Sequence, residues 1–136
     1  MLFQFNANYF EFVRDSGFVG FAQETSNKDP DGHYFWIMGA EIAEDIGPDL
    51  QHIYIELDDQ CGGQYGGLTS IALSRDRFTV YLDHIRDQEG IDTEFNAIQI
   101  DFKCDDTEFQ DLCEILQRIM ECHEDKLTFT EVSYST

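Results

Sequence analysis

Hydrophobic and polar residues alternate over several short stretches of this chain. In residues 77–82, Phe78, Val80 and Leu82 fall on one side of the alternation, and residues 95–102 repeat the pattern. Successive side chains of a β-strand point to opposite faces of a sheet, so such alternation predicts strands with one buried and one solvated face. The other stretches that we predict as strands are residues 2–5, 9–13, 18–22, 53–57 and 68–73, with 127–132 as an added edge strand.

Two stretches depart from simple alternation. Residues 34–38, Tyr-Phe-Trp-Ile-Met, are continuously apolar, which predicts a strand buried on both faces. Residues 54–68 carry Asp58 and Asp59 after the incoming strand and then four glycines within six residues. Because glycine tolerates φ > 0, this composition predicts a tight reversal between the strands on either side. The polar residues of the reversal either bind a partner or only meet water.

Residues 108–122 have the spacing of an amphipathic helix, with apolar side chains at every third or fourth position. Thr107 and Gln110 have the form of a capping box that would begin this helix. A second, short helix is predicted at residues 40–46, where a Gly-Pro pair would end it. The apolar stripe of the long helix, which would hold it to the sheet, consists of Phe109, Leu112, Cys113, Leu116, Ile119 and Met120.

These elements together predict an α+β fold. We expect a mostly antiparallel β-sheet, a meander of hairpins, with one C-terminal amphipathic helix packed on it. A chain of 136 residues is long enough for one core, so we predict a single domain over residues 1–136. The pattern leaves open the strand order and the choice between one sheet and two packed sheets.

Acidic residues far outnumber basic ones: 28 Asp and Glu stand against 8 Lys and Arg, a net charge of −20. Hydrophobic residues make up 42% of the chain, so we expect a folded domain rather than disorder. Phosphate backbones and anionic lipid surfaces would repel the chain, which argues against nucleic acid or a membrane as partner. A basic protein surface would attract it. The alternative is that the acids only form a solvated surface.

The chain begins without the basic region of a signal peptide, and no apolar run is long enough to cross a bilayer. We therefore expect a cytoplasmic protein. The four cysteines agree with a reducing compartment, because they are widely spaced and include no Cys-x-x-Cys pair. We expect thiols at Cys61, Cys104, Cys113 and Cys122.

Motifs of enzymes and metal sites are missing from the sequence. It contains no Gly-x-Ser-x-Gly, Walker or Rossmann pattern. Asp83 and His84 could be drawn into a triad with a distant serine, but any domain of this size offers such sets. Residues 122–125, Cys-His-Glu-Asp, lack the paired spacing of a zinc site, and residues 29–32 lack the later ligands of a calcium loop. We therefore expect no catalytic residues, no metal and no cofactor.

Three short motifs lie in the first two thirds of the chain. Residues 19–22 read Val-Gly-Phe-Ala, and residues 73–77 read Leu-Ser-Arg-Asp-Arg. Between them, residues 54–60 read Tyr-Ile-Glu-Leu-Asp-Asp-Gln, followed by Tyr-Gly-Gly at 65–67. In these motifs and in its late helix, the chain resembles the immunity proteins of bacterial polymorphic-toxin systems, in particular the family numbered ten. The resemblance spans residues 18–82.

The resemblance implies one immunity-protein-like domain that binds and neutralises a cognate toxin without catalysis. The toxin would be a basic domain, a nuclease for example, which an acidic surface would cover with carboxylates in place of phosphates. On this hypothesis the contact includes Glu56, Asp58, Asp59, Gln60 and Tyr65. Two alternatives stay open: the motif could only build its hairpin, or the chain could be an acidic adaptor or nucleic-acid mimic that binds basic proteins outside toxin biology. Monomer and homodimer are both compatible with the sequence.

Overall fold

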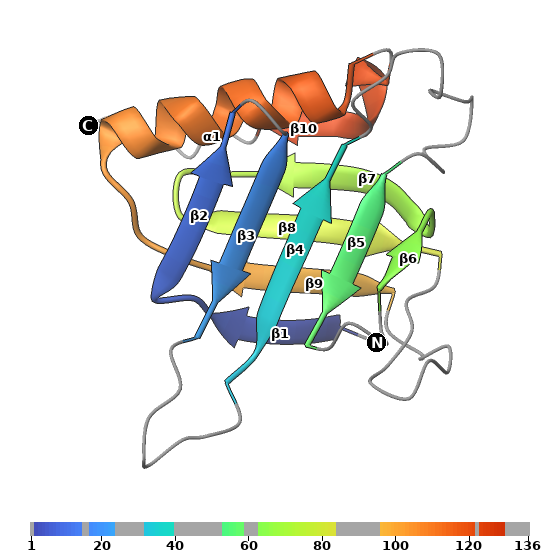
Figure 1. The fold of residues 1–136 in the computed structure, drawn as a ribbon, viewed down its shortest axis with the longest axis horizontal. Coiled ribbons are helices and arrows are strands. Elements are labelled where there is room, and N and C mark those ends of the chain that lie inside the picture. Colours follow the sequence, from blue (N-terminus) through green and yellow to red (C-terminus); the bar gives the residue numbers. More distant parts are fainter. Residues whose placement is uncertain are drawn as a thin grey trace.

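Two five-stranded sheets stack face to face in the computed structural model of the chain, and the strands of one sheet run across those of the other (Figure 1). The structure describes residues 2–14, 17–23, 32–39, 53–58, 63–83, 96–121 and 123–129. The first sheet has the strand order β1 (Leu2–Asn6), β9 (Ala97–Asp101), β8 (Arg77–Leu82), β7 (Leu68–Leu73) and β10 (Leu127–Phe129). The second sheet has the order β2 (Tyr9–Val13), β3 (Phe18–Ala22), β4 (Tyr34–Met38), β5 (Tyr54–Leu57) and β6 (Gln64–Tyr65).

Antiparallel pairing dominates both sheets. Every strand pair of the second sheet is antiparallel, as are β7–β8 and β8–β9 in the first. The outer strands of the first sheet, β1 and β10, instead run parallel to their neighbours. The helix α1 (Asp106–Ile119) follows β9, and a short 3₁₀ helix, η3 (Glu124–Lys126), precedes β10. The predicted α+β class, mostly antiparallel with a C-terminal amphipathic helix, is confirmed.

The hydrophobic core fills the space between the two sheets. Phe21 and Phe35 of the second sheet face Phe78 of the first, with ring centroids 5.0 Å apart for Phe21–Phe78 and 6.2 Å apart for Phe35–Phe78. All three rings are fully buried. Each large apolar side chain removed from water contributes about 1.5–3 kcal/mol to folding, so these inner faces hold the sheets together. The positions predicted to point inward in 77–82 and 95–102 are all buried: Phe78, Val80, Leu82, Ile98, Ile100 and Phe102.

Helix α1 lies along one end of the two sheets and closes that end of the core (Figure 1). Its apolar stripe buries Leu112, Ile115, Leu116 and Ile119, and it contacts β2 and β3. The predicted role of the stripe, which is to hold the helix to the sheet, is confirmed.

The helix begins earlier than the sequence predicts. Its N-cap is Asp105, whose carboxylate accepts a hydrogen bond from the backbone N–H of Glu108 at 2.7 Å. The side chain of Glu108 accepts one from the backbone N–H of Asp105 at 2.9 Å, which completes a capping box. The predicted cap formed by Thr107 and Gln110 is therefore wrong by two positions, because Asp105 and Glu108 satisfy the same pattern one half-turn earlier.

The chain does not form the predicted hairpin between residues 53–57 and 68–73. β5 pairs with the two-residue strand β6, with Tyr54 opposite Tyr65. The chain then crosses to the first sheet, where β7 pairs with β8. Gly66 (φ 85°) and Gly67 (φ 91°) stand at this crossing, in a backbone region that glycine enters at little cost. The glycines thus serve a change of sheet rather than a turn between neighbouring strands.

β4 is not buried on both faces, although its continuous apolar run predicts that it is. Phe35 and Ile37 point into the core and are fully buried, whereas Trp36 is 40% exposed and Met38 is 37% exposed. The run is apolar throughout because the outer face of β4 is itself a hydrophobic surface of the molecule.

Some predictions lie outside the described residues, namely the short helix at 40–46 and the last part of the strand at 127–132. The first part of that strand is confirmed as β10 at the edge of the first sheet. Within the part of the chain that the structure describes, no helix is long and apolar enough to span a membrane.

Candidate binding face

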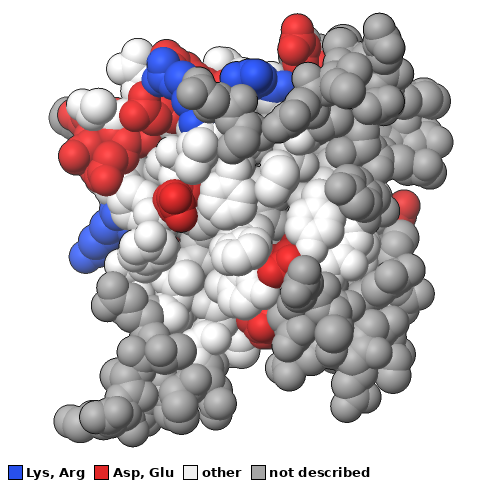
Figure 2. Space-filling view, viewed as in Figure 1, with Lys and Arg blue, Asp and Glu red and all other residues white. Residues whose placement is uncertain are grey.

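The outer face of the second sheet carries large hydrophobic side chains at its surface. Tyr9 is 50% exposed, Trp36 40% and Met38 37%, and Phe18 and Tyr34 beside them are half-buried. We call the surface made by these five residues the aromatic face. Figure 2 shows it as an uncharged centre that isolated carboxylates interrupt. Exposed apolar patches mark interaction sites, and tyrosine, tryptophan and methionine are enriched in protein–protein interfaces, so this is the candidate binding surface.

Strand register explains how the aromatic face is built. Glu11 of β2 pairs with Gly20 of β3. Gly20 in turn pairs with Trp36 of β4, which pairs with Glu56 of β5. Paired residues on antiparallel strands lie on the same face of a sheet. One row across four strands therefore runs from a carboxylate, over a glycine and an indole ring, to a second carboxylate.

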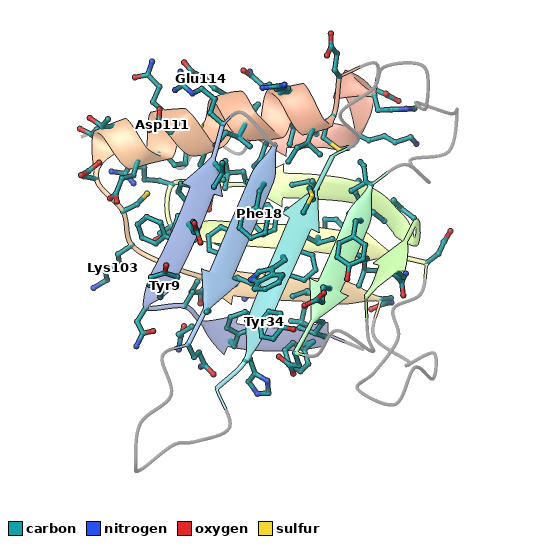
Figure 3. All side chains as sticks on the ribbon, in the orientation of Figure 1. Tyr9, Phe18, Tyr34, Lys103, Asp111 and Glu114 are labelled. Atoms are coloured by element: carbon teal, nitrogen blue, oxygen red, sulfur yellow. The ribbon has the colours of Figure 1, made fainter. Side chains whose placement is uncertain are left out.

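Gly20 leaves a hollow in the middle of the aromatic face. A Cβ atom at this position would lie 3.0 Å from Trp36 Cδ1 and 3.1 Å from Phe18 Cε1, so a larger residue would push against both rings. The ring centroids are 5.6 Å apart for Phe18–Trp36 and 4.9 Å apart for Tyr34–Trp36. Figure 3 shows Tyr9, Phe18 and Tyr34 on this face. The cavity has a volume of about 210 Å³ and is lined by Tyr9, Glu11, Phe18, Gly20, Phe21, Ala22, Tyr34 and Trp36.

Glu56, one of the residues that the sequence indicates for the contact, lies beneath this surface. It is only 4% exposed. Its Oε2 accepts a hydrogen bond from the Tyr34 hydroxyl and its Oε1 accepts one from the Tyr54 hydroxyl, each at 2.5 Å. Hydrogen bonds to a carboxylate are the stronger kind in proteins. Glu56 therefore fixes the two tyrosine rings that flank it on the aromatic face.

Asp58 fastens the end of β5 to β4. Its Oδ1 accepts a hydrogen bond from the backbone N–H of Tyr34 at 3.0 Å, and its own N–H donates to the Tyr34 carbonyl at 3.0 Å. Its Oδ2 lies 2.8 Å from Nδ1 of His33. The backbone φ of Asp58 is 66°, a conformation in which aspartate is enriched among non-glycine residues. Asp58 is thus held in place by two hydrogen bonds to the backbone of Tyr34 and one to the side chain of His33.

The remaining residues indicated by the sequence are less fully placed. The backbone of Tyr65 lies in β6, opposite Tyr54, while Asp59 and Gln60 lie outside the described residues. The structure therefore brings Glu56, Asp58 and the backbone of Tyr65 to one edge of the second sheet, beside the aromatic face.

Sequence reasoning missed the aromatic face itself, including Tyr9, Glu11, Phe18 and Trp36. A signal for it exists in residues 34–38, where alternation predicts that one of the two apolar faces must be the outer one. The motif around Glu56 indicates only the β5 end of the surface.

The described basic residues lie around the aromatic face rather than on its strands, and Lys103 lies near Tyr9 at the β2 edge (Figure 3). The strands β2–β6 contain no lysine or arginine. Arg14, directly after β2, contacts Asp111 and Glu114, the two α1 acids labelled in Figure 3, with nitrogen–oxygen distances of 2.5 and 2.6 Å. Glu11 and Glu56 form no ion pair within the described part of the chain. Glu11 and Glu56 therefore place carboxylates on the outer face of strands that carry no lysine or arginine.

The two described cysteines do not have the environment of catalytic thiols. Cys104 and Cys113 are free and half-buried, and burial raises the pKa of both. The guanidinium of Arg75, 3.3 Å from the Cys104 sulfur, offsets only part of the increase in the pKa of Cys104. A raised pKa leaves less reactive thiolate at neutral pH. Across the described ranges, no three His, Cys, Asp or Glu side chains gather as a metal ion would require.

Comparison with known proteins identifies a matching family. A family model described as Immunity protein 10 matches residues 6–110, which include all of the second sheet and the strands β7 to β9. No significant match was found among curated proteins or among solved structures. The matched region contains every residue that lines the cavity of the aromatic face.

Proposed function

This chain belongs to the immunity protein 10 family, and on that premise we propose that it binds the cognate toxin of a bacterial polymorphic-toxin system and blocks it without catalysis. The toxin docks on the aromatic face and on the acidic edge of β5 beside it. Inhibition follows because the bound protein covers the working surface of the toxin, and no bond is made or broken.

The composition of the aromatic face supports this proposal. It combines exposed rings, with Tyr9 50% and Trp36 40% exposed, with carboxylates and with strands that carry no lysine or arginine. In protein complexes a buried aromatic centre supplies most of the affinity, and surrounding charge supplies association rate and partner choice. The net charge of −20 favours a basic partner. A nuclease toxin fits, because a surface that binds phosphates is basic.

The five residues that the sequence indicates take different parts in this proposal. Asp59 and Gln60 directly follow Asp58 in the sequence, and on this proposal they and Tyr65 contact the toxin. Glu56 acts through the two tyrosine rings that it holds, and Asp58 through the end of β5 that it fixes.

Co-purification tests the function and the surface together. The tagged protein is recovered from its native cells under low-salt and then high-salt washes, and we expect one basic toxin domain to come with it. Trp36→Ala and Tyr9→Ala should lose this domain, since truncating a central interface side chain costs about 2 kcal/mol or more, roughly a thirtyfold weaker complex. Tyr81→Ala is the matched control, because Tyr81 is 45% exposed on the outer face of the first sheet. This control should keep the partner.

The possible outcomes separate function from location. Recovery of the toxin with both test variants unchanged would keep the function and move the contact off the aromatic face. Loss of the toxin with Asp59→Ala in the same experiment would extend the contact to the acidic rim. Failure to recover any specific partner under either wash would overturn the proposed function.

The net charge of −20 also favours a second candidate, an acidic adaptor or nucleic-acid mimic outside toxin biology. Such a protein would bind several basic proteins and would be displaced from each of them by DNA. An inhibitor of one toxin would instead give a single partner whose complex depends on the aromatic side chains.

A further inference from the structure

We propose that the cavity over Gly20 is a receptor for one arginine side chain of the bound partner. This inference rests on the proposed function and names the chemical group of the toxin that anchors it to the aromatic face. The residues that line it include four aromatic residues, Tyr9, Phe18, Tyr34 and Trp36, and one acid, Glu11.

The size of the cavity restricts its occupant. Its volume of about 210 Å³ lies below the range of roughly 300–1,000 Å³ that is typical of sites for small-molecule ligands. One long amino-acid side chain fits such a hollow, and a helix or a strand of a partner does not. The cavity therefore receives a single projecting group from a larger surface that lies across the aromatic face.

The chemistry of the cavity selects a cation. Faces of tyrosine, phenylalanine and tryptophan rings carry negative potential and attract lysine or arginine within about 6 Å. Glu11 adds a carboxylate to the lining, and the strands β2–β6 carry no lysine or arginine. An apolar side chain would fill the space but would gain nothing from the carboxylate. Arginine is favoured over lysine because its flat guanidinium stacks on rings and pairs with a carboxylate through two hydrogen bonds.

Gly20 makes room for two of the rings that line the cavity. Gly20 pairs directly with both Glu11 and Trp36, so any side chain at this position would project between the acid and the indole ring. The 3.0 Å separation between a Cβ at residue 20 and Trp36 Cδ1 shows that the ring already occupies the space of a side chain. Because residue 20 has no side chain, the Trp36 and Phe18 rings lie close against β3, where they form part of the lining of the cavity.

Fluorescence gives a direct test on the free protein, because Trp36 is the only tryptophan of the chain. The protein is titrated with N-acetyl-arginine amide and, separately, with N-acetyl-citrulline amide, which has the same shape without the charge. We expect a saturable change in Trp36 emission with the arginine probe alone. Glu11→Gln should weaken this binding about two- to fivefold. Glu121→Gln, an exposed acid after α1, is the matched control and should leave the titration unchanged.

Each outcome bears on the inference or on the function beneath it. An equal response to both probes, or no saturable response to either, overturns the arginine receptor even if the toxin co-purifies. An arginine-specific response that survives Glu11→Gln unchanged overturns the role of the carboxylate. An arginine-specific response in a protein that recovers no toxin would leave a cation site but contradict the proposed function and the toxin as its source.

Discussion

Glu56 is a carboxylate enclosed in the outer face of β5 and bonded through both oxygens to tyrosine hydroxyls. Replacing it with glutamine keeps the shape but leaves only one acceptor oxygen, so one of the two hydroxyls can no longer donate its hydrogen bond to residue 56. We expect Glu56→Gln to lower the free energy of unfolding by about 1–3 kcal/mol. Urea denaturation measures this change, and the slope of the free energy of unfolding against urea concentration should stay the same.

The same row of residues offers a matched control for this prediction. Glu11→Gln removes an exposed carboxylate from the opposite end of the row, and its effect on stability should stay within about 0.5 kcal/mol. If Tyr34→Phe is combined with Glu56→Gln, the double variant should lose less than the sum of the two, because both changes break the same hydrogen bond. Strict additivity, or a Glu56→Gln variant as stable as the parent, would contradict the role assigned to Glu56.

Adding one methyl group at Gly20 should change the affinity for the partner more than it changes the stability of the fold. In Gly20→Ala the new Cβ crowds Trp36 at 3.0 Å, but that ring is 40% exposed and can move outward. The crowding is offset in part by the lower entropy of the unfolded chain, so we expect a change in stability within about 1 kcal/mol. Affinity for the partner should fall by roughly tenfold, equivalent to about 1.4 kcal/mol, because the displaced ring changes the shape of the cavity.

Thermal unfolding and titration with the partner measure these two quantities on one sample of Gly20→Ala. Unchanged affinity together with unchanged stability would show that the cavity is not part of the contact. A large loss of stability would show instead that the rings over Gly20 are held rigidly by the fold.

At the scale of one element, the start of α1 distinguishes two overlapping capping signals. Asp105 with Glu108 forms the box in the structure, whereas Thr107 with Gln110 fits the same pattern in the sequence. We expect Asp105→Ala to destabilise the protein by about 1 kcal/mol, since an N-cap side chain satisfies an otherwise unpaired backbone N–H. Thr107→Ala should change stability by less than about 0.5 kcal/mol. Chemical denaturation of the two variants side by side decides between the caps, and the reverse order of effects would restore the cap at Thr107.

The alternation of apolar and polar residues predicts most strands correctly, because each strand turns one face toward the core. The pairing partners are a different matter. Asn6 and Tyr9 are close in sequence, yet β1 and β2 lie in different sheets, and β1 pairs with β9, which follows more than 90 residues later. Local alternation contains no information on such contacts, because the register of a strand is set by the side chains that it meets across the core.

The candidate site was predictable only in part for a related reason. The motif around Glu56 and Asp58 indicates the β5 edge through family resemblance, but Glu56 is buried and Asp58 is half-buried, with its carboxylate bonded to the backbone of β4. The exposed half of the surface comes from β2, β3 and β4. A continuous apolar run such as 34–38 is ambiguous, because burial on both faces and exposure of a binding surface produce the same residue types.

For the whole molecule, the main electrostatic fact is the excess of 28 acidic over 8 basic residues. Ion pairs such as Arg14–Asp111 and Arg77–Asp101 lie on exposed or half-exposed side chains, where each contributes about 0–1 kcal/mol. Mutual repulsion among the acids therefore outweighs the pairs in setting how salt acts on the free protein.

Salt should accordingly move folding and binding in opposite directions. Raising NaCl from about 0.01 M to 0.15 M shortens the screening length from roughly 30 Å to 8 Å. The repulsion within the free protein weakens, so its melting temperature should rise. The attraction to a basic toxin weakens as well, so the association rate measured by stopped flow should fall about tenfold or more. A melting temperature that falls with salt would mean that the ion pairs dominate stability after all. An association rate insensitive to salt would mean that the aromatic face recognises its partner without electrostatic steering, and the basic toxin would lose its main support.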